Sequence, residues 1–113
     1  MNRDAIHLAD IIKSARMIRD YVSGTTHRDF LANTQLQDSV IRRLEIIGEA
    51  AGRVSRQCRD ENPDIPWSQM RGMRNWVIHR YDDVDMDVVW ETVEQDIPLL
   101  IAQLEGLVSE ERS

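Results

Sequence analysis

The sequence predicts an all-α domain, an up-and-down bundle of four main helices joined by short connections. Three observations support this fold class. Apolar residues recur every three or four positions along most of the 113-residue chain, which is the period of an amphipathic helix. No stretch alternates between apolar and polar residues over the length of a strand. The segments between the periodic stretches are short and rich in glycine, proline, asparagine or aspartate, which are turn residues.

Length and composition indicate one domain that comprises residues 1–113. Hydrophobic residues make up 42% of the chain, which is enough for one core and too little for two. No run approaches the roughly 20 apolar residues that cross a bilayer, and Met1 to Asp4 leads into an amphipathic pattern instead of a signal peptide. Cys58 is the single cysteine, which fits a reducing compartment. We therefore expect a cytoplasmic protein that has no contact with membranes.

The first helix is predicted from about residue 4 to residue 22, with Asp4 as its N-cap and Gly24 as its stop signal. Its apolar face consists of Leu8, Ile11, Ile12, Ala15, Ile18 and Val22. Residues 25–33 are polar apart from Phe30 and Leu31, so we expect a connection there with about one helical turn.

The second long helix is predicted to begin at Thr34, which forms a capping-box pattern with Gln37. It should continue to about Cys58 and be the longest unbroken helix. Its apolar face consists of Leu36, Val40, Leu44, Ile47, Ala51 and Val54. Small residues at Gly48, Ala50 and Ala51 favour the close approach of a neighbouring helix at its middle.

Two more helices follow a proline-containing turn at residues 60–66. Pro66 fits the first turn of a helix that ends near Tyr81. Asp83 or Asp85 should cap the last helix, and Pro98 should kink or split it around residues 94–97. The chain after Val108 is expected to fray.

Charge is unevenly distributed along the second half of the chain. The net charge of −6 argues against a protein that coats nucleic acid in general. Residues 66–81 nevertheless contain three arginines and no acid, whereas residues 82–96 contain seven acids and no base. A positive pocket beside an acidic segment can bind a phosphate locally. The histidines and Cys58 lack the spacing of metal ligands, so we predict no metal site.

The arginine-rich stretch reads Met70-Arg71-Gly72-Met73-Arg74-Asn75-Trp76-Val77-Ile78-His79-Arg80-Tyr81. On a helix, Asn75 and His79 share a polar face, and Arg71 precedes them by one turn. Arg74 and His79 lie about 140° apart with a rise of about 7.5 Å, so a second copy of the helix across a symmetry axis would bring them together more naturally than one helix does.

Structural roles compete with catalytic ones for these residues. An arginine among apolar residues is often paired with a buried carboxylate, and a histidine near a helix end is often a cap. Glu45 and Glu49 are candidate partners for Arg74 or His79. Both glutamates can equally pair with arginines of their own helix, Arg42 and Arg53.

The pattern of Arg74, His79 and Tyr81, with four residues between the first two and one between the last two, resembles the signature of the HepT-like branch of the HEPN superfamily. Other parts of the chain are similar to that family in the same order: Ile47-Gly48-Glu49-Ala50-Ala51, Ile65-Pro66-Trp67, Val89-Trp90 and Asp96-Ile97-Pro98-Leu99-Leu100. The resemblance therefore covers most of the chain.

This resemblance implies a homodimer that brings two motif helices together in a cleft. It further implies a toxin of a toxin–antitoxin pair that acts as a metal-independent endoribonuclease without a cofactor. The implied partner is a minimal nucleotidyltransferase antitoxin, which transfers AMP to the tyrosine of the motif and so silences the toxin. In this sequence that tyrosine is Tyr81.

The residues suit the implied chemistry. RNA carries its own nucleophile, the 2′-hydroxyl, so a metal-free enzyme needs a proton carrier and a cation for the phosphorane charge. We assign His79 to general acid/base catalysis and Arg74 to the scissile phosphate, with Asn75 and Arg71 in support. The product would be a 2′,3′-cyclic phosphate. AMP on Tyr81 would add charge and bulk where RNA enters.

Two other functions fit the same residues. The first is a noncatalytic helical adaptor that binds a nucleotidyltransferase and a nucleotide through Arg71, Arg74 and Arg80. The second is a purely structural dimer, in which Glu45 and Glu49 satisfy Arg74 and His79 and no cleft is open.

Overall fold

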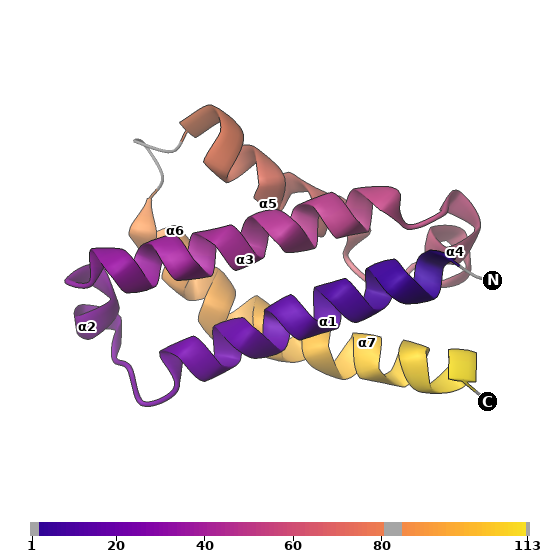
Figure 1. The fold of residues 1–113 in the computed structure, drawn as a ribbon, viewed down its shortest axis with the longest axis horizontal. Coiled ribbons are helices and arrows are strands. Elements are labelled where there is room, and N and C mark those ends of the chain that lie inside the picture. Colours follow the sequence, from indigo (N-terminus) through magenta and orange to yellow (C-terminus); the bar gives the residue numbers. More distant parts are fainter. Residues whose placement is uncertain (1–2, 81–84, 113) are drawn as a thin grey trace.

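The structure is a computed structural model that describes residues 3–80 and 85–112, and the side chains of residues 3–73 and 85–108. All regular structure in these ranges is helical, which confirms the predicted all-α class (Figure 1). The elements are α1 Arg3–Val22, α2 His27–Leu31, α3 Thr34–Arg53, α4 Arg56–Glu61, α5 Trp67–Arg80, α6 Met86–Glu91, the π-helical turn η2 Thr92–Asp96, and α7 Ile97–Arg112. Within the described ranges, no helix combines the length and apolar character that a membrane span requires.

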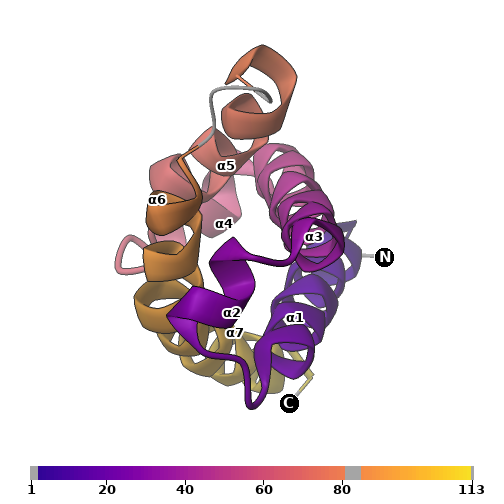
Figure 2. The same cartoon turned by 90° about the vertical axis from the view of Figure 1, so that its left-hand side faces the viewer.

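Helix α3 is the central element of the bundle. It packs against α1 and α5, and α1 packs in turn against α7. Seen along the bundle, α5, α3, α1 and α7 surround the interior, with α6 between α7 and α5 (Figure 2). Helix α5 begins at the end where α3 finishes and runs back along it, so the two helices are antiparallel (Figure 1). The predicted up-and-down bundle is therefore present.

One apolar core joins all the helices. The predicted apolar face of α1 is buried at Leu8, Ile11, Ile12, Ala15 and Ile18. Its last residue, Val22, is half-buried at the edge of the core. On α3, Val40, Leu44, Ile47, Ala51 and Val54 are buried, with Leu36 at the edge. Phe30 of the short α2 is fully buried and closes one end of the core. Burial of these faces removes apolar surface from water and is the main stabilising contribution.

The first helix ends as predicted and begins differently. Gly24 has a φ of 75°, the left-handed conformation that ends a helix and that glycine adopts without strain. Asp4 lies within the first turn of α1 instead of before it. Its Oδ1 accepts a hydrogen bond from the backbone N–H of Ser55 at 2.8 Å, and its Oδ2 accepts one from the Ser55 hydroxyl at 2.6 Å. Asp4 therefore ties α1 to the start of α4.

The start of α3 differs from the predicted capping box by one residue. The N-cap is Asn33, whose Oδ1 accepts a hydrogen bond from the backbone N–H of Leu36 at 3.0 Å. Gln37 does not return to the cap. Its side-chain amide donates to the carbonyls of Phe30 and Leu31 at 3.0 and 3.1 Å, and so holds α2 against α3.

The long helix predicted to reach Cys58 ends at Arg53, so that prediction was wrong. Val54 is extended, with a ψ of 136°, and Ser55 caps the separate helix α4 through its hydroxyl, which accepts from the N–H of Cys58 at 3.1 Å. With 20 residues, α3 has the same length as α1. The break keeps both Val54 and Cys58 buried and redirects the chain toward α5.

The last predicted helix is capped and interrupted as expected. Asp85 is the N-cap of α6, and its Oδ1 accepts from the N–H of Asp87 at 2.9 Å. The π-helical turn η2 occupies residues 92–96, just before Pro98, because proline cannot donate a backbone hydrogen bond to the preceding turn. The expected fraying after Val108 is not observed, since α7 stays helical to Arg112.

Replacing Ser55 with alanine should destabilise the fold by about 1–2 kcal/mol, because it removes the cap of α4 together with one hydrogen bond to Asp4. The free energy of unfolding from urea denaturation measures this loss. Ser68→Ala, at an exposed position of α5, is the matched control and should change stability little. Equal stability of the two variants would contradict this role of Ser55.

Candidate functional site

The motif stretch lies on one uninterrupted helix. Helix α5 comprises Trp67–Arg80, so the backbone of Arg74, Asn75 and His79 belongs to a single helical segment, as predicted. Arg71, Asn75 and His79 follow at four-residue intervals along it. The side chains of Arg74, Asn75, His79 and Arg80 lie outside the described residues, as does all of Tyr81. Their assigned roles therefore stay predictions.

The first half of α5 is firmly anchored. Pro66 lies directly before the helix, and its carbonyl accepts from the N–H of Met70 at 3.0 Å. The indole N–H of Trp67 donates to the carbonyl of Asn62 at 2.9 Å, and Trp67, Met70 and Met73 are buried in the core. These three side chains form the buried face of the first half of α5. Arg71 is exposed on the other side. A helix fixed over its first two turns holds the backbone of the following residues in register.

A groove of about 320 Å³ lies between α5 and α7. It is lined by Asp64, Pro66, Gln69, Met70, Met73, Asp96, Leu99, Leu100, Ala102 and Gln103. Two hydrogen bonds join its walls: Gln69 Nε2 donates to Asp96 Oδ2 at 3.0 Å, and Gln103 Nε2 donates to the carbonyl of Asp64 at 3.1 Å. Met73, the last of the lining residues on α5 whose side chains the structure describes, directly precedes Arg74. The groove therefore borders the motif and is mostly apolar.

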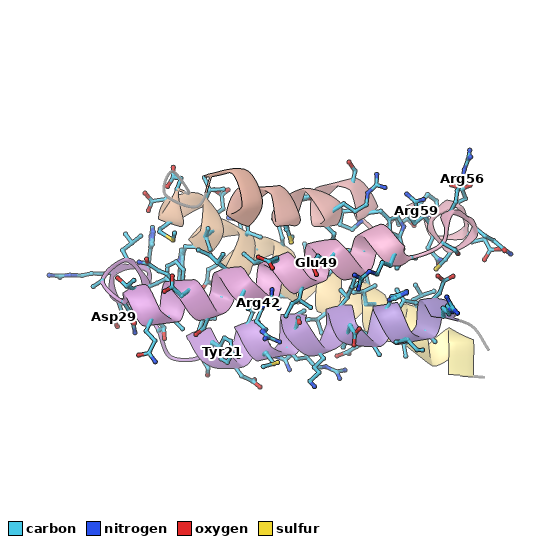
Figure 3. The ribbon with its side chains drawn as sticks, turned by 45° about the horizontal axis from the view of Figure 1, so that its top comes forward. Tyr21, Asp29, Arg42, Glu49, Arg56 and Arg59 are labelled. Atoms are coloured by element: carbon cyan, nitrogen blue, oxygen red, sulfur yellow. The ribbon has the colours of Figure 1, made fainter. Side chains whose placement is uncertain are left out.

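The acidic residues of α3 were candidate partners for the motif. Glu45 forms an ion pair with Arg42 of its own helix, at a spacing of three residues, and its side chain is 18% exposed. The expected partner Arg42 is therefore observed for Glu45, at a spacing of three residues instead of the four expected for a helical pair. Glu49 is half-buried on the same helix (Figure 3), and it forms no ion pair with any side chain that the structure describes.

A contact between α2 and α6 was not predicted from the sequence. The Nε2 of His27 lies 2.8 Å from Oδ1 of Asp87, and the imidazole stacks on the indole of Trp90 with ring centroids 5.7 Å apart. Trp90 also contacts Phe30, with centroids 5.2 Å apart. These contacts brace the start of α6, the first helix after the motif. The only sequence signal was a histidine in a polar connection, which does not identify a partner 60 positions away.

No cluster of three or more histidine, cysteine, aspartate or glutamate side chains suited to a metal ion occurs in the described part of the chain. Cys58 is buried in the core. Its backbone carbonyl accepts a hydrogen bond from the side-chain amide of Asn62 at 2.8 Å.

Comparison with known proteins identifies the family. A family model described as "Ribonuclease HepT-like" matches residues 11–107, a range that extends from α1 into α7 and includes all of α5. The chain belongs to the ribonuclease HepT-like family. The resemblance found in the motif and its flanks is thereby confirmed, as is the assignment to the HEPN superfamily.

Relatives in this HepT-like family align over most of the chain. A protein of Thermococcus cleftensis named "Probable ribonuclease HepT" is 40% identical over 101 residues, which are 89% of this chain and 92% of that protein. A "Putative RNase" of Methanocaldococcus jannaschii is 35% identical over 98 residues, or 87% of this chain and 90% of that protein.

Another M. jannaschii protein, named "Gamma-glutamylcyclotransferase and putative RNase", is 38% identical over 111 residues. The alignment covers 97% of this chain, which spans only 50% of that longer protein. No solved structure matches the chain.

Replacing His27 with alanine should loosen α6, because it removes the polar contact with Asp87 and the stack on Trp90. We expect a loss of about 1 kcal/mol in the free energy of unfolding, since an exposed ion pair adds little and ring stacking adds most. Hydrogen exchange should quicken at the amides of residues 86–91. His7→Ala, on α1, is the control and should leave α6 unchanged. Unaltered exchange in α6 of His27→Ala would contradict the bracing role.

Proposed function

We propose that this HepT-like protein is a metal-independent endoribonuclease that cuts RNA by attack of a 2′-hydroxyl on the adjacent phosphate. The observation that carries the proposal is the motif itself, since Arg74 and His79 belong to one continuous helix of a chain in the ribonuclease HepT-like family. The names of the related ribonucleases support the same substrate class.

The proposed chemistry needs a proton carrier and a cation. One imidazole accepts the proton of the 2′-hydroxyl, the 2′-oxygen bonds to phosphorus, and the bond to the 5′-oxygen breaks as that oxygen receives a proton from a second imidazole. In this proposal His79 supplies both imidazoles, one from each subunit of a homodimer. Arg74 binds the phosphate and stabilises the added negative charge of the transition state. Asn75 orients His79, and Arg71 lies one turn earlier. The products are a 2′,3′-cyclic phosphate and a 5′-hydroxyl.

Helix geometry supports the proposed homodimer. Arg74 and His79 are five positions apart in the sequence, so their positions on α5 differ by about 140° around the axis. Two copies of α5 related by a two-fold axis can contribute both residue types to one shared site. The anchored first half of α5, with Met70 and Met73 in the core, supplies the rigid support that such a site requires.

We further propose that the enzyme is the toxin of a toxin–antitoxin pair. A minimal nucleotidyltransferase antitoxin would transfer AMP from ATP to Tyr81. The phenol oxygen bonds to the α-phosphorus, pyrophosphate leaves, and the phenol proton passes to solvent. Because Tyr81 follows His79 by two residues, the bound AMP would place negative charge and bulk next to the RNA phosphate.

His79→Ala should reduce cleavage of RNA in EDTA by about 10²–10⁴-fold, which is the usual contribution of a general acid or base. Arg74→Ala should cost about 10²–10³-fold through lost transition-state stabilisation. Gel analysis of a labelled oligoribonucleotide measures the rate, and treatment with a 2′,3′-cyclic phosphodiesterase identifies the new ends. Arg19→Ala, at an exposed position of α1, is the matched control.

A mixing experiment tests the shared site. After the subunits of the two variants exchange, each heterodimer holds one Arg74 and one His79. If the two subunits share one site, such heterodimers should regain part of the activity, at a rate limited by the single imidazole. Variants that cut as well as wild type would overturn the assignment of Arg74 and His79, and wild-type protein that leaves RNA intact would favour the noncatalytic adaptor. A monomer in light scattering would overturn the dimer.

Incubation with the nucleotidyltransferase partner and ATP should add one or more AMP units to the intact mass and abolish RNA cleavage. Tyr81→Phe should gain no AMP and stay active in the presence of the partner. The other tyrosine of the chain, Tyr21, provides the matched control, because Tyr21→Phe should be modified like wild type. AMP that persists on Tyr81→Phe would show that another residue is the acceptor.

A further inference from the structure

A basic concavity lies far from the motif, where α1 begins and α3 ends. It measures about 670 Å³ and is lined by Arg3, Asp4, Ile6, His7, Arg53 and Ser55. Asp4 supplies the only carboxylate among these residues, and both of its oxygens accept hydrogen bonds from Ser55. Arg3 and Arg53 are exposed, and neither forms an ion pair with a carboxylate among the residues that the structure describes. The concavity therefore presents guanidinium groups to a ligand.

Neighbouring arginines extend this positive end. Arg56 and Arg59 of α4 lie at the same end of the molecule (Figure 3). Arg56 contacts Asp60 only loosely, at 3.6 Å between two highly exposed side chains. The Nε of Arg59 is buried and has no hydrogen-bond partner among the described residues. The arginines here are thus weakly compensated, although the chain as a whole is acidic.

The seam between α1 and α3 continues from this concavity to the other end of the bundle. At its middle, half-buried Arg43 donates from Nη1 to the sulfur of Met17 at 3.6 Å, where a carboxylate would be the stronger partner. At its far end lies a second concavity of about 230 Å³, lined by Tyr21, Asn33, Gln35, Leu36 and Ser39. The seam therefore combines cations at one end with an aromatic ring and polar side chains at the other.

This combination suits one class of ligand. Surfaces that bind single-stranded nucleic acid unite a positively charged groove along the backbone with aromatic rings on which bases stack. Helix α3 has 20 residues and is therefore about 30 Å long, so a strand along the seam would span several nucleotides. Helix α3 also packs against α5, so the seam and the motif helix lie on two flanks of α3.

We propose that the seam between α1 and α3 is a binding surface for single-stranded RNA, separate from the motif, at which Arg3 and Arg53 contact phosphates and Tyr21 stacks on a base. The proposal rests on the proposed ribonuclease function for its choice of ligand. It assigns the seam to substrate binding and leaves cleavage to the residues of α5.

Fluorescence anisotropy with a labelled 2′-O-methyl oligoribonucleotide tests this surface. The probe lacks the nucleophilic hydroxyl, so its binding is measured whether or not the protein cleaves RNA. The double variant Arg3→Gln/Arg53→Gln should bind roughly 20-fold more weakly at 0.1 M salt, and the slope of log K against log salt should fall in magnitude by about 1.4, or about 0.7 for each lost phosphate contact. Tyr21→Leu should weaken binding by about tenfold.

The matched control is Lys13→Gln/Arg19→Gln, which removes the same charge from two exposed residues of α1 that line neither concavity. It should keep the wild-type salt slope. Circular dichroism confirms that each variant is folded. Unchanged affinity and slope in Arg3→Gln/Arg53→Gln, or an equal loss in the control, would overturn the proposal. Displacement of the probe by polyglutamate as effectively as by unlabelled RNA would also overturn it, because the surface would then bind acidic peptides.

Discussion

The structure depends on the burial of α3 between two neighbours. Gly48, Ala50 and Ala51 are buried in its second half, and residues this small allow the neighbouring helices to approach closely. Contact with α5 on one flank fixes where the motif helix lies, and contact with α1 on the other flank creates the seam with its basic end. The candidate site on α5 and the proposed RNA surface between α1 and α3 therefore lie on two flanks of α3.

The break after Arg53 links stability to surface chemistry. An unbroken helix through residue 58 would continue along the axis of α3. The extended Val54 and the cap at Ser55 instead turn the chain, so that α5 can run back along α3. Asp4 fixes this turn by accepting two hydrogen bonds from Ser55. The same hydrogen bonds give Asp4, the one carboxylate that lines the basic concavity, a partner in Ser55. Asp4 therefore competes less with an anionic ligand for Arg3 and Arg53.

Several acids of the segment 82–96 have individual structural roles in place of a uniform solvated face. Asp85 caps α6, Asp87 pairs with His27, and Asp96 accepts a hydrogen bond from Gln69 of α5. The contact of Asp87 with His27 joins α6 to α2, and the hydrogen bond between Gln69 and Asp96 joins α5 to η2. Some of the carboxylates that follow the motif therefore stabilise the positions of α5 and α6.

The sequence by itself determined the fold class, the order of the helices, the stop at Gly24, the cap at Asp85 and the interruption before Pro98, because each depends on residues within a few positions of one another. It also placed Arg74, Asn75 and His79 on one helix, and the motif with its flanks identified the family. The cap at Asn33 is also local, and the capping-box pattern missed it by one residue. Only the tertiary structure decided that the helix breaks at Val54, that His27 pairs with Asp87, and that Arg3 joins Arg53 in one concavity. Each of these outcomes depends on packing or on a partner from another element, and local periodicity carries no information about either.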